Sequence, residues 1–515
     1  MRKLLAFLVL TVSATAQNVT VDGNTTFQTM AGIGINVNKD MWLSGNLGPA
    51  LDLYAQTNGA SLYRIIVECY DWVCPLGSGC NTKSSAESQL SLMNTEAINR
   101  SSNPGYSIPT LTTWYEASAM TDLWNTIARL NQNGITGNQI IVNPQGWTTQ
   151  WLGGDGQFAS TPANKINSGQ ENDYAEMVAT LIFYGKVVRG LNFNIFDPLN
   201  EPTNGDSREG PTVSSGQAET IYTDIVNDLS NYGITTFNLQ APSLCCDNPS
   251  SDDNTWATAI SNNSTAFPHI PHFSLHDYQG TGPGGSPPSS IGGHDWWVTE
   301  TNSECLPTTS NCDSGTAYPS QGEWTWSDQT GDMMMDHIAN GFPATLVWAG
   351  TNSYELQESS PVVLNDFYHM LYNSGTGLFT AHKGFYVTAI LASGIKPGIV
   401  RISATTTLGS NFRVFAFYNS TTGKVSVLGH NKTGSTASVS GKFNNLPTLS
   451  TLKFWLTDSG SNNFSAQSNV TVSSQAFSTS IPSDTFFLLA TPDPNSGIDA
   501  AAQGTASLQG SAVME

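Results

Sequence analysis

Short apolar runs recur through the first 350 residues, and most of them end in polar side chains. They are rich in Val, Ile, Leu and aromatic residues, a composition that is typical of buried β-strands. Eight runs of this kind predict strands at 30–37, 61–68, 139–145, 193–200, 237–242, 272–278, 296–300 and 344–350.

Helical periodicity separates most of these strands. The clearest stripe places Tyr174, Met177 and Leu181 on one face, after a capping residue at Asn172 or Asp173. The predicted helices span 47–58, 117–132, 171–189, 217–232, 252–261 and 328–340. Strands that alternate with helices in this way favour a closed parallel barrel, so the sequence predicts an α/β fold with a (β/α)8 TIM barrel at 31–396. One connection departs from the pattern, because the Gly and Pro residues of 279–295 cannot form a normal helix.

The pattern changes after about residue 397. Short β-branched or aromatic runs follow one another there, separated by turn residues, at 399–405, 411–418, 424–430, 451–456 and 485–490. No helical stripe comes after 385–392. We therefore predict an appended C-terminal all-β sandwich at 397–491. The last stretch, 492–515, is small and polar, and we expect it to be disordered.

The first sixteen residues have the pattern of a secretory signal peptide. Arg2 and Lys3 precede an apolar run at 4–12, and the small residues at 14–16 fit a cleavage site. That run is too short to span a bilayer, and no later run reaches 18 apolar residues. We therefore expect a secreted, extracellular protein with no membrane partner.

An oxidising compartment would allow disulfides and glycosylation. We expect disulfides between Cys74 and Cys80 and between Cys305 and Cys312, whereas the pairing of Cys69, Cys245 and Cys246 stays open. Of the Asn-x-Ser/Thr glycosylation acceptors, we expect only some to be occupied. They lie at Asn18, Asn24, Asn99, Asn262, Asn263, Asn419, Asn431, Asn463 and Asn469.

Charge and motifs argue against several classes of protein. The chain has 19 Lys and Arg against 40 Asp and Glu, a net charge of −21, so nucleic acid is not an expected partner. No nucleophile elbow of the Gly-x-Ser-x-Gly type occurs, and no complete phosphate-binding or dinucleotide motif. Because the His residues are scattered and no Cys-x-x-Cys pair exists, we expect neither a metal nor a cofactor. We expect a monomer.

Two glutamates stand at the ends of predicted strands. Glu201 follows the fourth strand in Asp-Pro-Leu-Asn-Glu-Pro, and Glu300 ends the seventh strand in Trp-Trp-Val-Thr-Glu. In a TIM barrel, function lies at the C-terminal ends of the strands, so these carboxylates should face each other across one pocket. Two such carboxylates suffice to cleave a glycosidic bond, since one protonates the leaving oxygen and the other attacks the anomeric carbon.

With these two motifs the sequence resembles clan A of the glycoside hydrolases, which are retaining enzymes, and within it family 30 and neighbouring families. The resemblance covers roughly residues 18–490. It implies that Glu201 is the acid/base, that Glu300 is the nucleophile and that Asn200 hydrogen-bonds the sugar. It also implies that an N-terminal strand at 17–30 joins the β-sandwich. The strand-three segment with Asn143 and Trp147 is similar only in outline.

The resemblance extends to residues around the two glutamates. Arg64 matches an arginine that pairs with the nucleophile, His276 and Tyr278 match a His-x-Tyr on the sixth strand, and Trp348 matches a tryptophan on the eighth. The chemistry of these side chains is consistent with the matches. An arginine beside Glu300 would keep that carboxylate ionised. Tyr278 can contact Glu300 or the ring oxygen, and His276 can contact Glu201 or a sugar hydroxyl.

The sequence also places aromatic residues where a sugar would bind. Trp147, Trp151 and Trp348 can stack on sugar rings, and Trp72, Trp324 and Trp326 can extend that platform. The expected substrate-binding residues are Arg64, Asn143, Trp147, Asn200, His276, Tyr278 and Trp348.

The sequence therefore predicts a secreted retaining endo-β-glycanase. Its expected partner is a cell-wall polysaccharide or oligosaccharide: β-1,3/1,6-glucan, β-1,6-galactan or xylan. The alternative is a non-catalytic carbohydrate-binding or wall-associated protein on the same barrel.

Overall fold

Eight parallel strands form one sheet in the order β6-β5-β4-β3-β2-β9-β8-β7. Isolated parallel bridges from Gln240 to His272 and from Leu244 to Leu275 join β6 to β7, so the sheet closes. The strands are β2 (Gly32–Asn38), β3 (Leu62–Glu68), β4 (Gly137–Gln145), β5 (Phe193–Phe196), β6 (Asn238–Leu239), β7 (His272–Asp277), β8 (Asp295–Thr301) and β9 (Ala344–Val347). All eight predicted strands are present, and the predicted TIM barrel is confirmed.

The structure of the chain is a computed structural model. The residues that it describes are 17–69, 83–146, 148, 152, 165–204, 209–241, 243–244, 251–278, 292–303, 323–351, 369–373 and 376–492.

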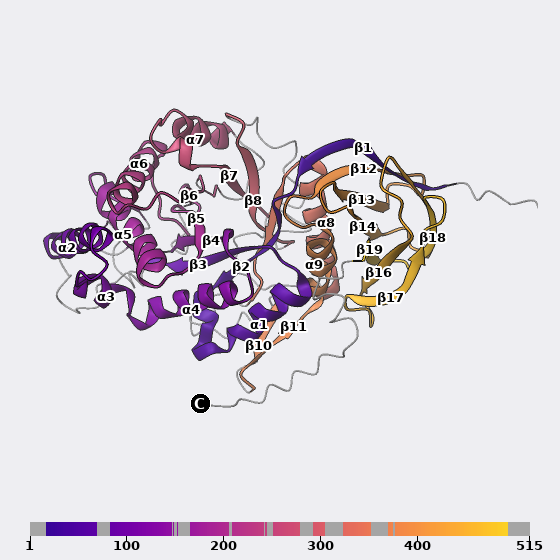
Figure 1. Cartoon of the computed structure of the whole chain (residues 1–515), viewed down its shortest axis with the longest axis horizontal. Coiled ribbons are helices and arrows are strands. Elements are labelled where there is room, and N and C mark those ends of the chain that lie inside the picture. The colour runs from indigo at the N-terminus through magenta and orange to yellow at the C-terminus, as the bar shows by residue number, and fades with distance from the viewer. Residues whose placement is uncertain are drawn as a thin grey trace, which may run out of the picture.

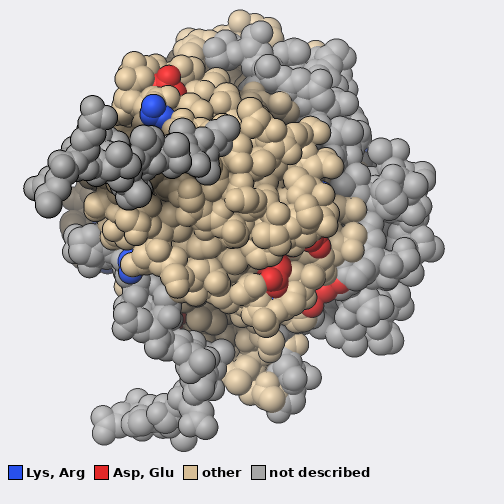
Figure 2. Space-filling view, turned by 90° about the vertical axis from the view of Figure 1, so that its right-hand side faces the viewer, with Lys and Arg blue, Asp and Glu red and all other residues tan. Residues whose placement is uncertain are grey.

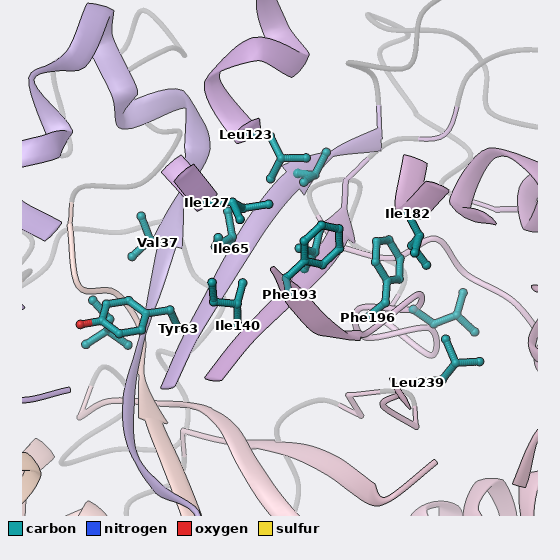
Figure 3. Close-up of a cluster of buried hydrophobic side chains, with 14 of the residues drawn as sticks. Val37, Tyr63, Ile65, Leu123, Ile127, Ile140, Ile182, Phe193, Phe196 and Leu239 are labelled. Carbon is teal, nitrogen blue, oxygen red and sulfur yellow. The ribbon is translucent and has the colours of Figure 1, made fainter. Parts of the chain in front are cut away.

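Side chains alternate between two apolar environments along each barrel strand. On β3, Leu62 belongs to a small cluster inside the barrel, whereas Tyr63 and Ile65 belong to the large core under the helices. Figure 3 shows Ile65 of β3 and Ile140 of β4 in the same apolar cluster as Leu123 and Ile127 of α4. Residues of one parity therefore anchor the helices, and residues of the other parity fill the barrel.

The helices of the described residues cover the outside of the barrel (Figure 1). They are α1 (Leu47–Leu53), α2 (Lys83–Ser102), α3 (Pro109–Tyr115), α4 (Ser118–Gln132), α5 (Glu171–Phe183), α6 (Ser215–Asn231), α7 (Ser251–Ser261), α8 (Glu323–Asn340) and α9 (Lys383–Gly394). Capping residues in the local sequence fix the first turn of a helix. At α6, for example, Ser214 and Gln217 form a capping box that satisfies orphan backbone N–H groups.

A second sheet of nine strands contains the C-terminal residues and the N-terminal strand β1 (Val19–Thr29). Its order is β17-β16-β19-β14-β13-β12-β1-β15-β18, antiparallel except for the pair β1 and β15. The edge strands β17 and β18 contact each other, so one curled sheet encloses its own apolar cluster. The strands are β12 (Val400–Thr406), β13 (Phe412–Asn419), β14 (Lys424–Asn431), β15 (Ala437–Asn444), β16 (Thr451–Asp458), β17 (Ser465–Thr471), β18 (Ala476–Ile481) and β19 (Thr485–Ala490).

Sequence patterning missed the elements that have weak periodicity. Helix α2 was not predicted, because its sequence is mostly polar, and the short α3 was missed as well. Three strands were missed, β15, β17 and β18, in which Ser and Thr replace most of the β-branched apolar residues. The hairpin of β10 (Met370–Asn373) and β11 (Leu378–Ala381) was missed too.

Most of the features expected from secretion lie outside the described residues. This applies to the segment 1–16, to the tail from 493 onward and to six of the seven cysteines; Cys69 is buried at the end of β3. Two glycosylation acceptors are buried, and their amides donate hydrogen bonds inside the protein: Asn263 to Glu219 and Asn431 to Ile481. The folded protein therefore does not offer these two for modification. No helix in the described part combines the length and the apolar character needed to cross a bilayer.

The face formed by the nine-stranded sheet carries few charges (Figure 2). Only 11% of the chain is charged.

Helices α8 and α9 lie between the barrel and the second sheet (Figure 1). Asp332 of α8 is the centre of the polar contact between this helix and the second sheet. It accepts from Arg413 Nη1 at 3.1 Å and Lys432 Nζ at 2.6 Å, and His430 Nδ1 lies 3.1 Å away. Burial would raise the pKa of Asp332, but the hydrogen bonds and charges of these neighbours lower it to about 2.

This geometry predicts a pH-dependent contribution of Asp332 to stability. Because the folded pKa lies below the unfolded value of 3.8, the contribution is complete above about pH 4 and disappears as the pH falls through 2. Asp332→Asn should therefore lower the free energy of unfolding by about 2 kcal/mol at pH 6, and by about half as much near pH 3. Urea-induced unfolding at the two pH values measures the difference.

Asp328, one turn earlier on α8, provides the matched control. Burial raises its pKa, so its contribution to stability is lost as the pH rises. Relative to the unmodified protein, Asp328→Asn should gain stability between pH 3 and pH 6. Equal pH dependence of the two variants would contradict the assignment.

Candidate active site

A buried arginine occupies the centre of the barrel, above its apolar layer. On β3 every second side chain points into the barrel, and this set includes Leu62, Arg64 and Glu68. The Arg64 side chain is fully buried. Its Nη1 donates to Glu300 Oε1 and, at 3.1 Å, to Asn36 Oδ1, while its Nη2 donates to Asn200 Oδ1 at 2.6 Å and to Asp197 Oδ2 at 3.4 Å. Burial opposes the charge of Arg64, but Glu300 and Asp197 outweigh this effect, and the pKa of Arg64 is raised.

Asp197 lies beneath this arginine and completes a buried polar layer. Its Oδ2 accepts from Ser243 Oγ at 2.6 Å, and Ser243 Oγ in turn lies 2.9 Å from Ser274 Oγ and 3.2 Å from Thr299 Oγ1. Burial raises the pKa of Asp197 to about 6, despite the opposing effect of Arg64. The layer therefore holds Arg64 from below.

A β-bulge directs Glu300 into the barrel. Leu275 pairs with Val298, but the next residue, His276, pairs with Glu300, so Thr299 is an extra residue in β8. The pairing of β8 with β9 shifts at the same point. Trp297 faces the barrel interior and Val298 faces the helices, so strict alternation would direct Glu300 outward. With the bulge, both Thr299 and Glu300 face inward.

Glu300 is held from two sides at that point. Arg64 donates to Oε1, and the hydroxyl of Tyr278 donates to Oε2 at 2.6 Å. These two donors fix the orientation of the Glu300 carboxyl group.

Glu201 lies five residues beyond β5. Its backbone φ of 39° is in the left-handed region, which is uncommon for a residue with a side chain. Its amide donates to the carbonyl of Ser243 at 2.8 Å, which fixes this turn to the neighbouring strand position. Its Oε1 lies 2.6 Å from His276 Nδ1, and its Oε2 accepts from Asn204 Nδ2 at 2.8 Å.

His276 lies between the two glutamates. Its Nδ1 is 2.6 Å from Glu201 and 3.4 Å from Glu300. Burial, followed by the charge of Arg64, lowers the pKa of His276 to about 3, although Glu300 acts in the opposite direction. The imidazole is therefore neutral near neutral pH.

The carboxylates of Glu201 and Glu300 are close neighbours. One oxygen of each lies within 4.8 Å of the other and of a ring nitrogen of His276. In the described part of the chain, such a donor set also occurs at Asp328, Asp332 and His430. A metal ion would be compatible with either donor set, but the guanidinium of Arg64 already supplies a positive charge beside Glu300.

The other predicted site residues are placed as follows. Asn143 is buried, and its Nδ2 donates to the backbone carbonyl of Asp197 at 2.8 Å, so it supports the segment that leads to Glu201. Trp348 is half-buried directly after β9, and its carbonyl accepts from Asn302 at 2.7 Å. Trp147 lies outside the described residues.

The predicted aromatic platform is wrong at two of its positions. Trp324 and Trp326 belong to α8 rather than to a loop. Trp324 donates to Asp484, the residue before β19, at 2.7 Å, and Trp326 is buried against His369. Both therefore serve packing. Trp72 and Trp151 lie outside the described residues.

The sequence did not single out three polar residues of the site. Asp197 was taken as part of a strand, and Asn204 and Glu209 lie in a loop without a recognisable pattern. Glu209 Oε2 accepts from Asn200 Nδ2 at 2.8 Å and from Gln145 Nε2 at 3.1 Å. Asp197 could have been suspected, because it begins the Asp-Pro-Leu-Asn-Glu motif.

Comparisons with known proteins identify the fold. No protein-family model matches the sequence, and no curated protein matches it. Several solved structures do match. The catalytic domain of GH30 xylanase C from Talaromyces cellulolyticus has a TM-score of 0.65 at 17% identity, over 92% of this chain and 100% of that one.

Two further solved structures also match the fold of this chain. The glycoside hydrolase family 30 subfamily 8 xylanase Xyn30A from Clostridium acetobutylicum has a TM-score of 0.63 at 17% identity, over 92% of this chain and 99% of that one. The endo-β1,6-glucanase BT3312 has a TM-score of 0.60 at 15% identity, over 92% and 94%. The chain therefore has the clan A-like glycoside hydrolase fold that family 30 enzymes share.

Proposed function

We propose that the protein is a retaining β-glycosidase that uses Glu201 as acid/base and Glu300 as nucleophile. One observation carries this proposal: oxygens of the two carboxylates lie within 4.8 Å of each other at the C-terminal end of the barrel. Retaining glycosidases have carboxyl groups about 5–5.5 Å apart, whereas inverting enzymes need about 6.5–9.5 Å.

The two glutamates have the different surroundings that double displacement requires. Arg64 and Tyr278 donate to Glu300, which orients this carboxyl group for attack on the anomeric carbon. Glu201 lies against the neutral imidazole of His276. A neutral imidazole can accept the proton of Glu201 in a hydrogen bond or, in its other tautomer, donate to the carboxylate. Both protonation states of an acid/base therefore have a partner.

In the first step Glu300 forms a bond to the anomeric carbon while the glycosidic C–O bond breaks, and Glu201 gives its proton to the leaving oxygen. In the second step Glu201 takes a proton from water. The water oxygen attacks the same carbon, and the bond to Glu300 breaks. Two inversions return the β configuration, and Glu201 is protonated again.

The proposed substrate is an extracellular β-linked polysaccharide, cleaved within the chain. Family 30 structures with this fold include xylanases, and another matched structure is an endo-β1,6-glucanase. The signal-like segment 1–16 supports secretion, which would allow disulfides and glycosylation at exposed acceptors such as Asn24 and Asn469. β-1,3/1,6-Glucan, β-1,6-galactan and xylan are the polymers to screen, with the products separated by chromatography.

Stereochemistry tests the carboxylate spacing. Because two displacements occur at one carbon, the first product released should be the β anomer. Proton NMR during the first minutes of hydrolysis, before mutarotation, distinguishes the anomers. An initial α anomer would rule out the two-step route.

Variants of the two glutamates test the assigned roles. Glu300→Ala should remove turnover, because no glycosyl-enzyme can form. With an activated aryl glycoside, Glu201→Ala should accumulate the intermediate, since that leaving group needs no proton. On substrates that need the proton, the rate should fall by ~10² or more.

Azide provides the control in both variants, because it needs no general base. It should restore turnover in Glu201→Ala with a β-glycosyl azide as product. In Glu300→Ala it should attack from the opposite face and give the α-azide. Restored activity also shows that each variant is folded. The reverse pair of products would interchange the roles, and unchanged rates in both variants would show that neither glutamate is catalytic. No hydrolysis by the unmodified protein would favour a non-catalytic carbohydrate-binding protein.

A further inference from the structure

Glu209 holds the side-chain amide of Asn200, the residue that precedes Glu201. Its Oε2 accepts from Asn200 Nδ2 at 2.8 Å and from Gln145 Nε2 at 3.1 Å. Both donors are buried, whereas Glu209 itself is half-buried. Because the acceptor is a carboxylate, these hydrogen bonds are charge-assisted and stronger than those between neutral groups.

The opposite end of the same amide is held by Arg64. Its Nη2 donates to Asn200 Oδ1 at 2.6 Å. A flipped amide would turn its NH2 group toward the guanidinium and its carbonyl toward the carboxylate, so that two donors and two acceptors would face each other. The orientation of Asn200 is therefore unique, and Glu209 fixes its nitrogen end.

The contacts form one chain across the site, from Glu300 through Arg64 and Asn200 to Glu209. The first of these is the proposed nucleophile, so the amide of Asn200 is positioned relative to the group that would bond to the sugar. Hydrogen bonds to the sugar 2-hydroxyl strengthen in the transition state of glycosidases and supply several kcal/mol. An amide so near the nucleophile is suited to make one.

We propose that Glu209 is a positioning residue that acts through Asn200 on the 2-hydroxyl of a sugar bound at Glu300. The proposal rests on the proposed glycosidase function. In this proposal Glu209 does not contact the reacting atoms. Without this carboxylate, Nδ2 of Asn200 loses its fixed direction, and the hydrogen bond to the 2-hydroxyl weakens.

The test compares substrates with and without that hydroxyl. The probes are 2,4-dinitrophenyl β-glycosides of glucose, galactose and xylose, and the 2-deoxy form of the one that is hydrolysed. Glu209→Ala should lower kcat/KM on the parent glycoside by about 10- to 100-fold, the loss expected for a hydrogen bond to a charged group. On the 2-deoxy glycoside the same substitution should change kcat/KM by less than about 3-fold.

Glu209→Gln separates positioning from charge. Its Oε1 can accept from both amides, so kcat/KM should stay within about 3-fold of the unmodified protein on either substrate. Glu219→Ala removes a carboxylate from the outer helix α6 and is the matched control, with unchanged activity expected. Thermal unfolding of each variant checks that it is folded.

The outcomes separate this inference from the function on which it rests. If the unmodified protein hydrolyses no glycoside or polysaccharide, the proposed function fails. If it is active but Glu209→Ala is equally active, or loses the same factor on both substrates, the positioning role is overturned. A loss confined to the parent glycoside and restored by Glu209→Gln supports it.

Discussion

The site depends on one buried cation. The Arg64 side chain is fully buried inside the barrel, and a buried charge without partners would cost several kcal/mol. Those partners are Asn36 of β2, Glu300 of β8, and Asp197 and Asn200 of the segment after β5. The same contacts that make the arginine tolerable set the orientation of the proposed nucleophile and of the amide beside Glu201. Structure and chemistry are therefore coupled at a single side chain.

Around this centre the barrel divides into layers of different polarity. An apolar layer with Leu62 and Trp297 fills the interior first, and the polar layer of Asp197, Ser243 and Thr299 follows it. The glutamates come last, where the strands end. Each layer restricts the next, because a close-packed floor and a hydrogen-bonded layer leave Arg64 few ways to move. Preorganisation of this kind is what charge stabilisation during glycoside cleavage requires.

Much of the fold and part of the site followed from local pattern. All eight barrel strands were predicted, because each is an apolar run with a polar end. The barrel pattern then placed Glu201, Glu300 and Arg64 at the same end, where the structure brings them together. Helix α2 and the Ser-rich strand β17 were missed, because tertiary contacts rather than their own periodicity stabilise them.

Which residue types stand at the ends of the strands can be read from the alternation along the chain. How those side chains point depends on the folded arrangement around them. The bulge at Thr299 turns Glu300 inward, against the alternation that Trp297 and Val298 set up. Glu209 reaches Asn200 from a loop in which no residue pattern marks its direction. Both depend on where neighbouring strands and loops lie in space, and a pattern along one strand carries no information about its neighbours' register.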